Sequence, residues 1–155
     1  MEFSHVDEAG AARMVDVTDK AATARAAVAS GVLRTTPEVV ELLRRDGLPK
    51  GDALATARIA GIMGAKRTPD LVPLCHPIAL TGVVVEFEPA HAEVRIIATV
   101  RTTDRTGVEM EALTAVAVAG LALHDMLKAV DPAATLDAVR VERKEGGKTG
   151  TWVRP

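Results

Sequence analysis

The chain has 155 residues, 48% of them hydrophobic, and a formal net charge of −2. This length suits a single domain with its own core, and the near-neutral charge argues against a nucleic-acid-binding surface. Aromatic residues are scarce (two Phe, one Trp and no Tyr), which argues further against a sheet that stacks single-stranded bases.

The same composition bears on compartment and membrane association. A single cysteine excludes a disulfide within the chain and is typical of a reducing compartment. The first residues have neither the basic start nor the apolar run of a signal peptide. The longest apolar run, ALTAVAVAGLAL, is shorter than the roughly 20 residues of a membrane helix. We therefore expect a cytoplasmic protein that does not bind a membrane.

The N-terminal part contains a polar arm and one ambiguous segment. Residues 1–12 are polar and contain Ala and Gly, so a flexible arm is expected. In residues 23–35 the alanines favour a helix, whereas Val28, Val32 and Leu33 beside a glycine fit a strand. Both interpretations stay open from the sequence.

Two helices are predicted next. In TTPEVVELLRRDGLP, Thr36 is a suitable cap, Pro37 suits the first helical position and Gly47 is expected to stop the helix. A second helix begins after Asp52, a further capping residue, and runs through ALATARIAGIMGAK (53–66).

The middle of the chain predicts a β-hairpin. LTGVVVEFEP (80–89) and AEVRIIATVRT (92–102) are β-rich runs separated by a short turn. Apolar residues occupy alternate positions of the second run, namely Val94, Ile96, Ala98 and Val100. This alternation predicts one face directed toward a core.

The last third completes the plan. A long helix is predicted from about 108 to 130, ended by Asp131-Pro132, and a strand over residues 138–144. KEGGKTG (144–150) predicts a mobile loop. The order strand, helices, strand, strand, helix, strand indicates an α+β fold of the ferredoxin-like βαββαβ type, with helices on one face of an antiparallel sheet. Residues 1–155 are expected to form one catalytic domain.

The segment PDLVPLCHP (69–77) places Cys75 beside His76 between prolines. Adjacent residues of an extended segment point to opposite sides, which argues against a Cys–His catalytic dyad. The segment fits a stiff loop that presents one side chain to a ligand, or equally a buried thiol beside a hydrogen-bonded histidine. The remaining histidines show no metal-ligand spacing with this pair: they are His5, His91 and His124.

Four charged residues mark the long helix: Glu109, Glu111, Asp125 and Lys128. Glu109 stands three residues after Thr106, so the two fit a capping box as well as a site. Asp125 and Lys128 have the spacing of a surface ion pair. At 100° per residue, Glu111, Asp125 and Lys128 share one stripe about 100° wide.

Fourteen residues separate Glu111 from Asp125, which is about 21 Å of helix. One small-molecule pocket within one subunit can hardly use both side chains. If the helix pairs antiparallel with its copy across a two-fold axis, Glu111 of one chain approaches Asp125 of the other. Self-association would then build the site.

Several lysines occupy positions suited to phosphate. Lys50 precedes a helix N-terminus, Lys66 begins the prolyl segment, and Lys144 and Lys148 flank two glycines. Each of them also fits a solvated surface charge. The sequence GGKT resembles the end of a P-loop, but Glu142 stands where the first glycine is required, so that interpretation fails.

Four stretches resemble one family. MVDVTDKAAT, KGDALATARIAGIMGAKRTPDLVPLCHP, TGVEMEALTAVAVAGLALHDMLKAV and KEGGKTG are similar, in the same order, to the cyclic pyranopterin monophosphate synthases of molybdenum cofactor biosynthesis, the MoaC family. The likeness spans about residues 13 to 150. It departs at His124, where an aromatic residue is common, and at Pro69 after Thr68.

The resemblance implies conversion of a cyclised dihydro-GTP (3′,8-cyclo-7,8-dihydro-GTP) to cyclic pyranopterin monophosphate with release of pyrophosphate, a lyase reaction. The catalytic residues that it implies are Asp125, Lys50, Lys128 and His76. The substrate-binding residues that it implies are Leu74, Cys75, His76, Glu109, Met110 and Glu111, with Lys66, Lys144 and Lys148 near the phosphates. No metal site and no cofactor are expected, and assistance by Mg²⁺ is left open. A homo-oligomer is implied, a hexamer built as a trimer of dimers with the active site at the dimer interface.

Two alternatives belong to other functional classes. A nucleotide-sensing module would keep the basic loops and still function without Asp125. A structural assembly domain would need neither His76 nor the lysines.

Overall fold

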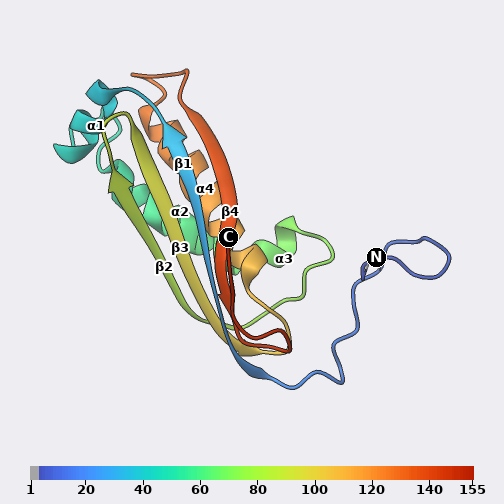
Figure 1. Cartoon of the computed structure of the whole chain (residues 1–155). Helices are drawn as coiled ribbons and strands as arrows, with labels where there is room; N and C mark the ends of the chain where they lie inside the picture. Colours follow the sequence, from blue (N-terminus) through green and yellow to red (C-terminus); the bar gives the residue numbers. More distant parts are fainter. Residues whose placement is uncertain (1–3) are drawn as a thin grey trace.

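The computed structural model describes residues 4–155. Its elements in chain order are β1 (Thr23–Arg34), α1 (Pro37–Arg44), α2 (Ala53–Lys66), α3 (Thr68–Leu71), β2 (Leu80–Pro89), β3 (Glu93–Asp104), α4 (Glu109–Leu127), β4 (Thr135–Glu145) and β5 (Trp152–Val153). All strand pairs are antiparallel, in the order β2-β3-β1-β4-β5. Helices α2 and α4 cover one face of the sheet (Figure 1). The α+β class is confirmed, and the order of the first four strands accords with the ferredoxin-like plan.

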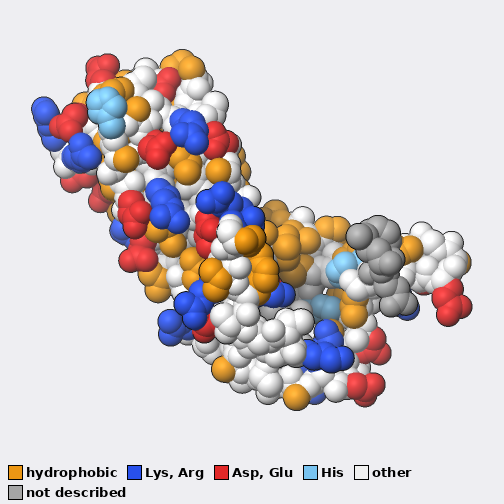
Figure 2. All heavy atoms as spheres, in the orientation of Figure 1, with side chains coloured by type: hydrophobic (Ala, Val, Ile, Leu, Met, Phe, Trp, Pro, Cys, Tyr) orange, Lys and Arg blue, Asp and Glu red, His pale blue; other side chains and the backbone are white. Residues whose placement is uncertain are grey.

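The opposite face of the sheet carries both signs of charge. Basic and acidic side chains are interspersed over it, with apolar side chains between them (Figure 2). It therefore presents no field of a single sign.

The ambiguous segment 23–35 is the central strand, β1, with β3 on one side and β4 on the other. Its alternate residues Ala27, Ala29 and Leu33 are at most 1% exposed beneath the helices. At Gly31 a Cβ atom would lie 2.7 Å from Cγ1 of Val116 in α4. The small residues that suggested a helix instead let α4 lie close against the strand.

Local capping follows the sequence prediction. The side chains of Thr36 and Asp52 accept hydrogen bonds from the backbone N–H groups of Val39 and Ala55, the third residues of α1 and α2. The predicted stop at Gly47 is displaced by one residue: Asp46 takes the left-handed conformation (φ 51°). The N–H of Gly47 then donates to the carbonyl of Leu42 at 2.8 Å, which closes the helix end.

The predicted hairpin is formed by β2 and β3, and the apolar face of β3 lies in the core. Val94, Ile96, Ala98 and Val100 are each 0% exposed. Alternation alone identified this buried face correctly.

Helix α4 is the central element of the core. Its length and hydropathy would suit a membrane span, but 56% of that stretch is buried within the fold. It packs against α2 through Gly61 and Gly64, where an added Cβ would lie 2.9 Å from the Ala115 carbonyl oxygen and 2.8 Å from Val118 Cγ2. It ends at Leu127 rather than 130, because the carbonyl of Leu127 accepts the N–H groups of the turn that follows.

The two ends of the chain hold structure that the sequence did not predict. Strand β4 continues through Glu145, and the loop that follows returns as β5, which pairs Trp152 with Lys144. Near the N-terminus, Val6 and Ala12 form a β-bridge within the predicted arm, whose residues 1–3 lie outside the described residues. Figure 1 shows the segment before β1, residues 4–22, running from the start of β1 toward the loop after α3. The mobility predicted for the arm and for 144–150 stays a prediction.

Candidate active site

The predicted site residues gather at the two ends of α4. At its C-terminal end, Asp125 lies between two lysines: Lys50 Nζ is 2.8 Å from Oδ2, and Lys128 Nζ is 2.7 Å from Oδ1. Lys50 comes from the loop before α2, so the cluster joins two elements. The Asp125 side chain is 54% exposed. Hydrogen bonds first from Lys128 and then from Lys50 lower the pKa of Asp125 to about 2, so this carboxylate stays ionised.

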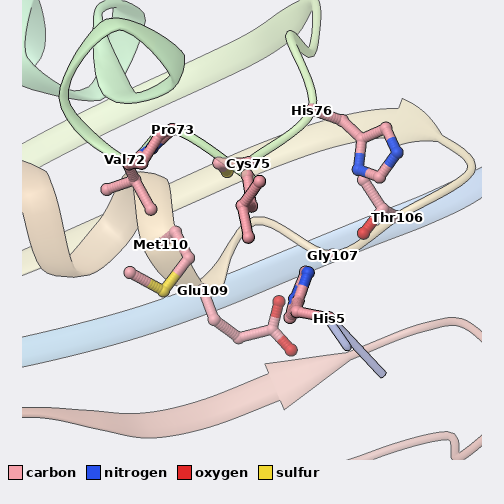
Figure 3. Close-up of a pocket in the computed structure, with 10 residues that line it drawn as sticks. His5, Val72, Pro73, Cys75, His76, Thr106, Gly107, Glu109 and Met110 are labelled. Carbon is pink, nitrogen blue, oxygen red and sulfur yellow. The ribbon is translucent and has the colours of Figure 1, made fainter. Parts of the chain in front are cut away.

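At the N-terminal end of α4 lies a cavity of about 520 Å³ (Figure 3). The loop after α3, the start of α4 and the N-terminal arm contribute its lining: Val72, Pro73, Leu74, Cys75, His76, Thr106, Gly107, Glu109, Met110 and His5. Most of these side chains are apolar or carry one polar tip, a lining suited to a planar, partly polar ring system.

His76 and Cys75 point to different partners, as their adjacency predicts. Nε2 of His76 lies 2.6 Å from the carbonyl oxygen of Val15. Because a carbonyl only accepts, Nε2 carries the proton, and Nδ1 of the neutral ring keeps its lone pair. Sγ of Cys75 lies 3.6 Å from Oε1 of Glu111. Burial, followed by the nearby Glu111, raises the pKa of the Cys75 thiol to about 11, so it is not an activated nucleophile.

Glu111 occupies a different environment from the one that its helical position predicts. It is 1% exposed, whereas Asp125 and Lys128 lie at the surface. The angular stripe that the three residues share says nothing of this difference in burial. Burial raises the pKa of Glu111 above its ordinary value. Within residues 4–155, its Oε2 is the one buried side-chain oxygen or nitrogen without a hydrogen-bond partner. The solvent stripe of α4 instead passes through Met110 and Leu121.

A second, basic cavity of about 330 Å³ adjoins the first, because Thr106, Gly107 and Glu109 line both. Its lining carries four cations, Lys20, Arg25, Lys144 and Lys148, against two carboxylates, Glu109 and Glu145. Glu109 forms a 3.2 Å ion pair with Lys144, and α4 has no side-chain cap. The capping-box interpretation of Thr106 and Glu109 is therefore wrong.

The sequence analysis missed Lys20 and Arg25 as members of this cavity. Arg25 is held by its Nε, which donates to the carbonyl of Asp104 at 2.9 Å. Arg25 stands two residues before buried Ala27, so both side chains point to the face of the sheet that the helices cover. The sequence predicts this direction only if residues 23–35 are taken as a strand. Lys66, in contrast, is an exposed residue at the end of α2 and lines neither cavity.

One chain does not bring the two ends together. Sixteen residues separate Glu109 from Asp125, which corresponds to about 24 Å along α4. His76 and the basic cavity thus belong to one end, and the Lys50–Asp125–Lys128 cluster to the other. Within residues 4–155, no group of three or more His, Cys, Asp or Glu side chains is arranged to hold a metal ion.

Comparison with known proteins agrees with the motifs. Residues 14–147 match the model of the MoaC family. A Mycobacterium tuberculosis protein named cyclic pyranopterin monophosphate synthase 2 is 66% identical over 153 residues, covering 99% of this chain and 92% of the relative. Proteins named cyclic pyranopterin monophosphate synthase from Streptomyces coelicolor (67% identity over 98% of this chain and 89% of the relative) and Nocardioides sp. (61%, over 99% and 96%) are similar along nearly their whole length. The chain therefore belongs to the MoaC family.

Proposed function

We propose that this chain is a cyclic pyranopterin monophosphate synthase of molybdenum cofactor biosynthesis. It would convert the cyclised dihydro-GTP to cyclic pyranopterin monophosphate and release pyrophosphate, as a lyase. The observation that carries the proposal is the pair of adjoining cavities around Glu109, one mostly apolar and one lined by four cations. Relatives with this printed name, 57–67% identical to the chain, support it.

The two cavities suit the two halves of such a substrate. A triphosphate carries about four negative charges, and lysine and arginine groups bind it and stabilise departing pyrophosphate. Lys20, Arg25, Lys144 and Lys148 supply these groups, while the neighbouring apolar cavity accepts the ring system. The three glycines of the 146–150 loop, all at positive φ, would let that loop adjust over the phosphates.

The chemistry requires several proton transfers. Lys50 and Lys128 are ammonium groups held in place by Asp125, and thus are preorganised donors for the substrate. A phosphate or ring oxygen that draws one lysine away would raise the basicity of Asp125, which then accepts a proton. Nδ1 of His76 offers a second acceptor in the apolar cavity. We propose that these side chains act without a resident cofactor.

A second copy would unite the two ends of α4. The outer face of α2 and α4 leaves large apolar side chains in solvent: Ile59, Met63 and Leu121, which are 60%, 48% and 65% exposed. An antiparallel pairing of α4 with its copy would cover this face and bring Asp125 of one subunit toward His76 of the other. We propose a homo-oligomer with shared active sites, a hexamer of three such dimers, in the cytoplasm.

The deciding experiment is turnover of the cyclised dihydro-GTP by the purified protein. We expect cyclic pyranopterin monophosphate, detected as its fluorescent oxidised pterin, and an equal amount of pyrophosphate. Addition of EDTA would test whether Mg²⁺ takes part. Tight binding without product would instead indicate a nucleotide-sensing module, and neither binding nor product would indicate a structural assembly domain.

A further inference from the structure

A second histidine lines the apolar cavity. His5, from the N-terminal arm, borders the same space as His76 and Glu109 (Figure 3). It lies outside residues 14–147, the part of the chain that matches the family model. No role follows for it from the motifs, and yet it is the only residue of the arm that reaches the lining of this cavity within residues 4–155.

The arm holds His5 in a defined turn. The N–H of Arg13 donates to the carbonyl of His5 at 2.9 Å, next to the bridge between Val6 and Ala12. Within that turn, Oδ1 of Asp7 accepts the N–H groups of Ala9 and Ala11 at 2.9 and 2.8 Å. An aspartate that closes its own turn in this way reduces the freedom of the segment that carries the imidazole.

Both histidine rings are anchored on backbone carbonyls of the segment that joins the arm (residues 1–12) to β1. Nδ1 of His5 lies 3.3 Å from the carbonyl oxygen of Arg13, and Nε2 of His76 lies 2.6 Å from that of Val15. Each anchored nitrogen must carry a proton, since a carbonyl only accepts. The other nitrogen, Nε2 of His5 or Nδ1 of His76, therefore has a lone pair in the neutral ring. The same N–H···O=C bond persists in the imidazolium, so either ring can take up a proton without losing its anchor.

We infer that His5 is a second acid–base residue of this cavity, which the arm brings to the bound ring system. Nε2 of His5 accepts one proton from an N–H or O–H group of the substrate and returns it to the substrate later in the same turnover, so the residue ends unchanged. This inference rests on the proposed function. The part of the chain before β1 thereby acts on both imidazoles: the arm carries His5, and the carbonyl of Val15 anchors His76.

The test compares His5→Ala with His91→Ala. His91 is an exposed histidine in the β2–β3 turn, at the far end of β3 from the cavity, and its replacement should leave turnover unchanged. For His5→Ala we expect kcat to fall about 100-fold with KM changed by less than about threefold, and added imidazole to restore part of kcat. The acid–base role is overturned if kcat of His5→Ala stays within twofold of the parent. It is also overturned if only KM rises and added imidazole restores no activity.

A binding measurement separates this inference from the proposed function. In protein labelled with ¹⁵N in histidine, a non-hydrolysable GTP analogue should shift the Nε2 resonance of His5 and leave that of His91 unchanged. If the parent protein makes no product, this shift still supports His5 as a residue of the nucleotide cavity. An unshifted His5 resonance with saturating nucleotide overturns it, whether or not the parent is active.

Discussion

The shared active site can be tested by combining two inactive subunits. His76 belongs to the N-terminal end of α4 and Asp125 to the C-terminal end, about 24 Å apart along the helix from Glu109 to Asp125. Glu111→Ala is a poor partner for this experiment because that side chain is buried against Cys75. His76→Ala and Asp125→Ala each remove one polar group from a partly or largely exposed position, so the fold should survive both.

Symmetry gives the expected magnitude. In a mixed dimer, one pocket combines His76→Ala with Asp125→Ala, and the other contains both native residues. Equal expression with random assembly makes about half of the dimers mixed, so about a quarter of all pockets would be intact. Purified mixed dimers, with one intact pocket of two, would retain about half of the activity of the parental dimer.

The two chains should be co-expressed with different affinity tags, so that mixed assemblies are isolated before turnover is measured. Lys50→Ala combined with Asp125→Ala is the matched control: both lesions lie at the same end of α4, so neither pocket of a mixed dimer is repaired. Verified mixed assemblies of His76→Ala and Asp125→Ala that stay as inactive as their parents would refute the shared pocket.

The remaining predictions concern one group each. Asp125→Asn should lower kcat at least about 100-fold while the thermal midpoint stays near that of the parent, since the side chain is exposed; near-normal turnover would contradict its catalytic role. Glu111→Gln should flatten the dependence of stability on pH. Burial raises the pKa of Glu111 above 4.5, so between 4.5 and the raised pKa the folded chain keeps a proton that the unfolded chain loses. The stability of the parent should therefore fall as pH rises through this range, and that of the variant should not. Equal slopes in thermal melts of parent and variant would count against a neutral buried carboxyl. Amide hydrogen exchange across residues 146–150 should slow when a GTP analogue binds, and unchanged exchange would argue against closure of that loop.

Short-range features of the sequence predicted the scaffold well. Thr36 and Asp52 cap their helices because the cap bond involves residues only three positions away. The alternation that ends in Val100 identified the core face of β3, because the geometry of a strand fixes it. Such local rules also gave most of the order of elements, but they left residues 23–35 open between helix and strand and did not predict β5.

Features that depend on distant neighbours could not be predicted. Rotation along a helix gives the direction of Glu111 but not its depth, and the loop that carries Cys75 covers it. Glu109 fits a capping box locally, yet Lys144 from β4 competes successfully for its carboxylate. The position of His5 depends on where the whole arm lies, and no periodicity in the sequence encodes that.

Helix α4 fixes the distance between the two groups of site residues at its ends. Glycines let neighbouring elements lie close against it on its sheet side and on its α2 side: Gly31 of β1 lies against Val116, Gly61 of α2 against Ala115, and its own Gly120 against Leu136 of β4. One inserted residue would advance the far end by 1.5 Å and turn it by about 100°, which would carry Asp125 away from Lys50. Evolutionary change in length should therefore accumulate in the loops and the arm, while the interval from Glu109 to Asp125 stays constant.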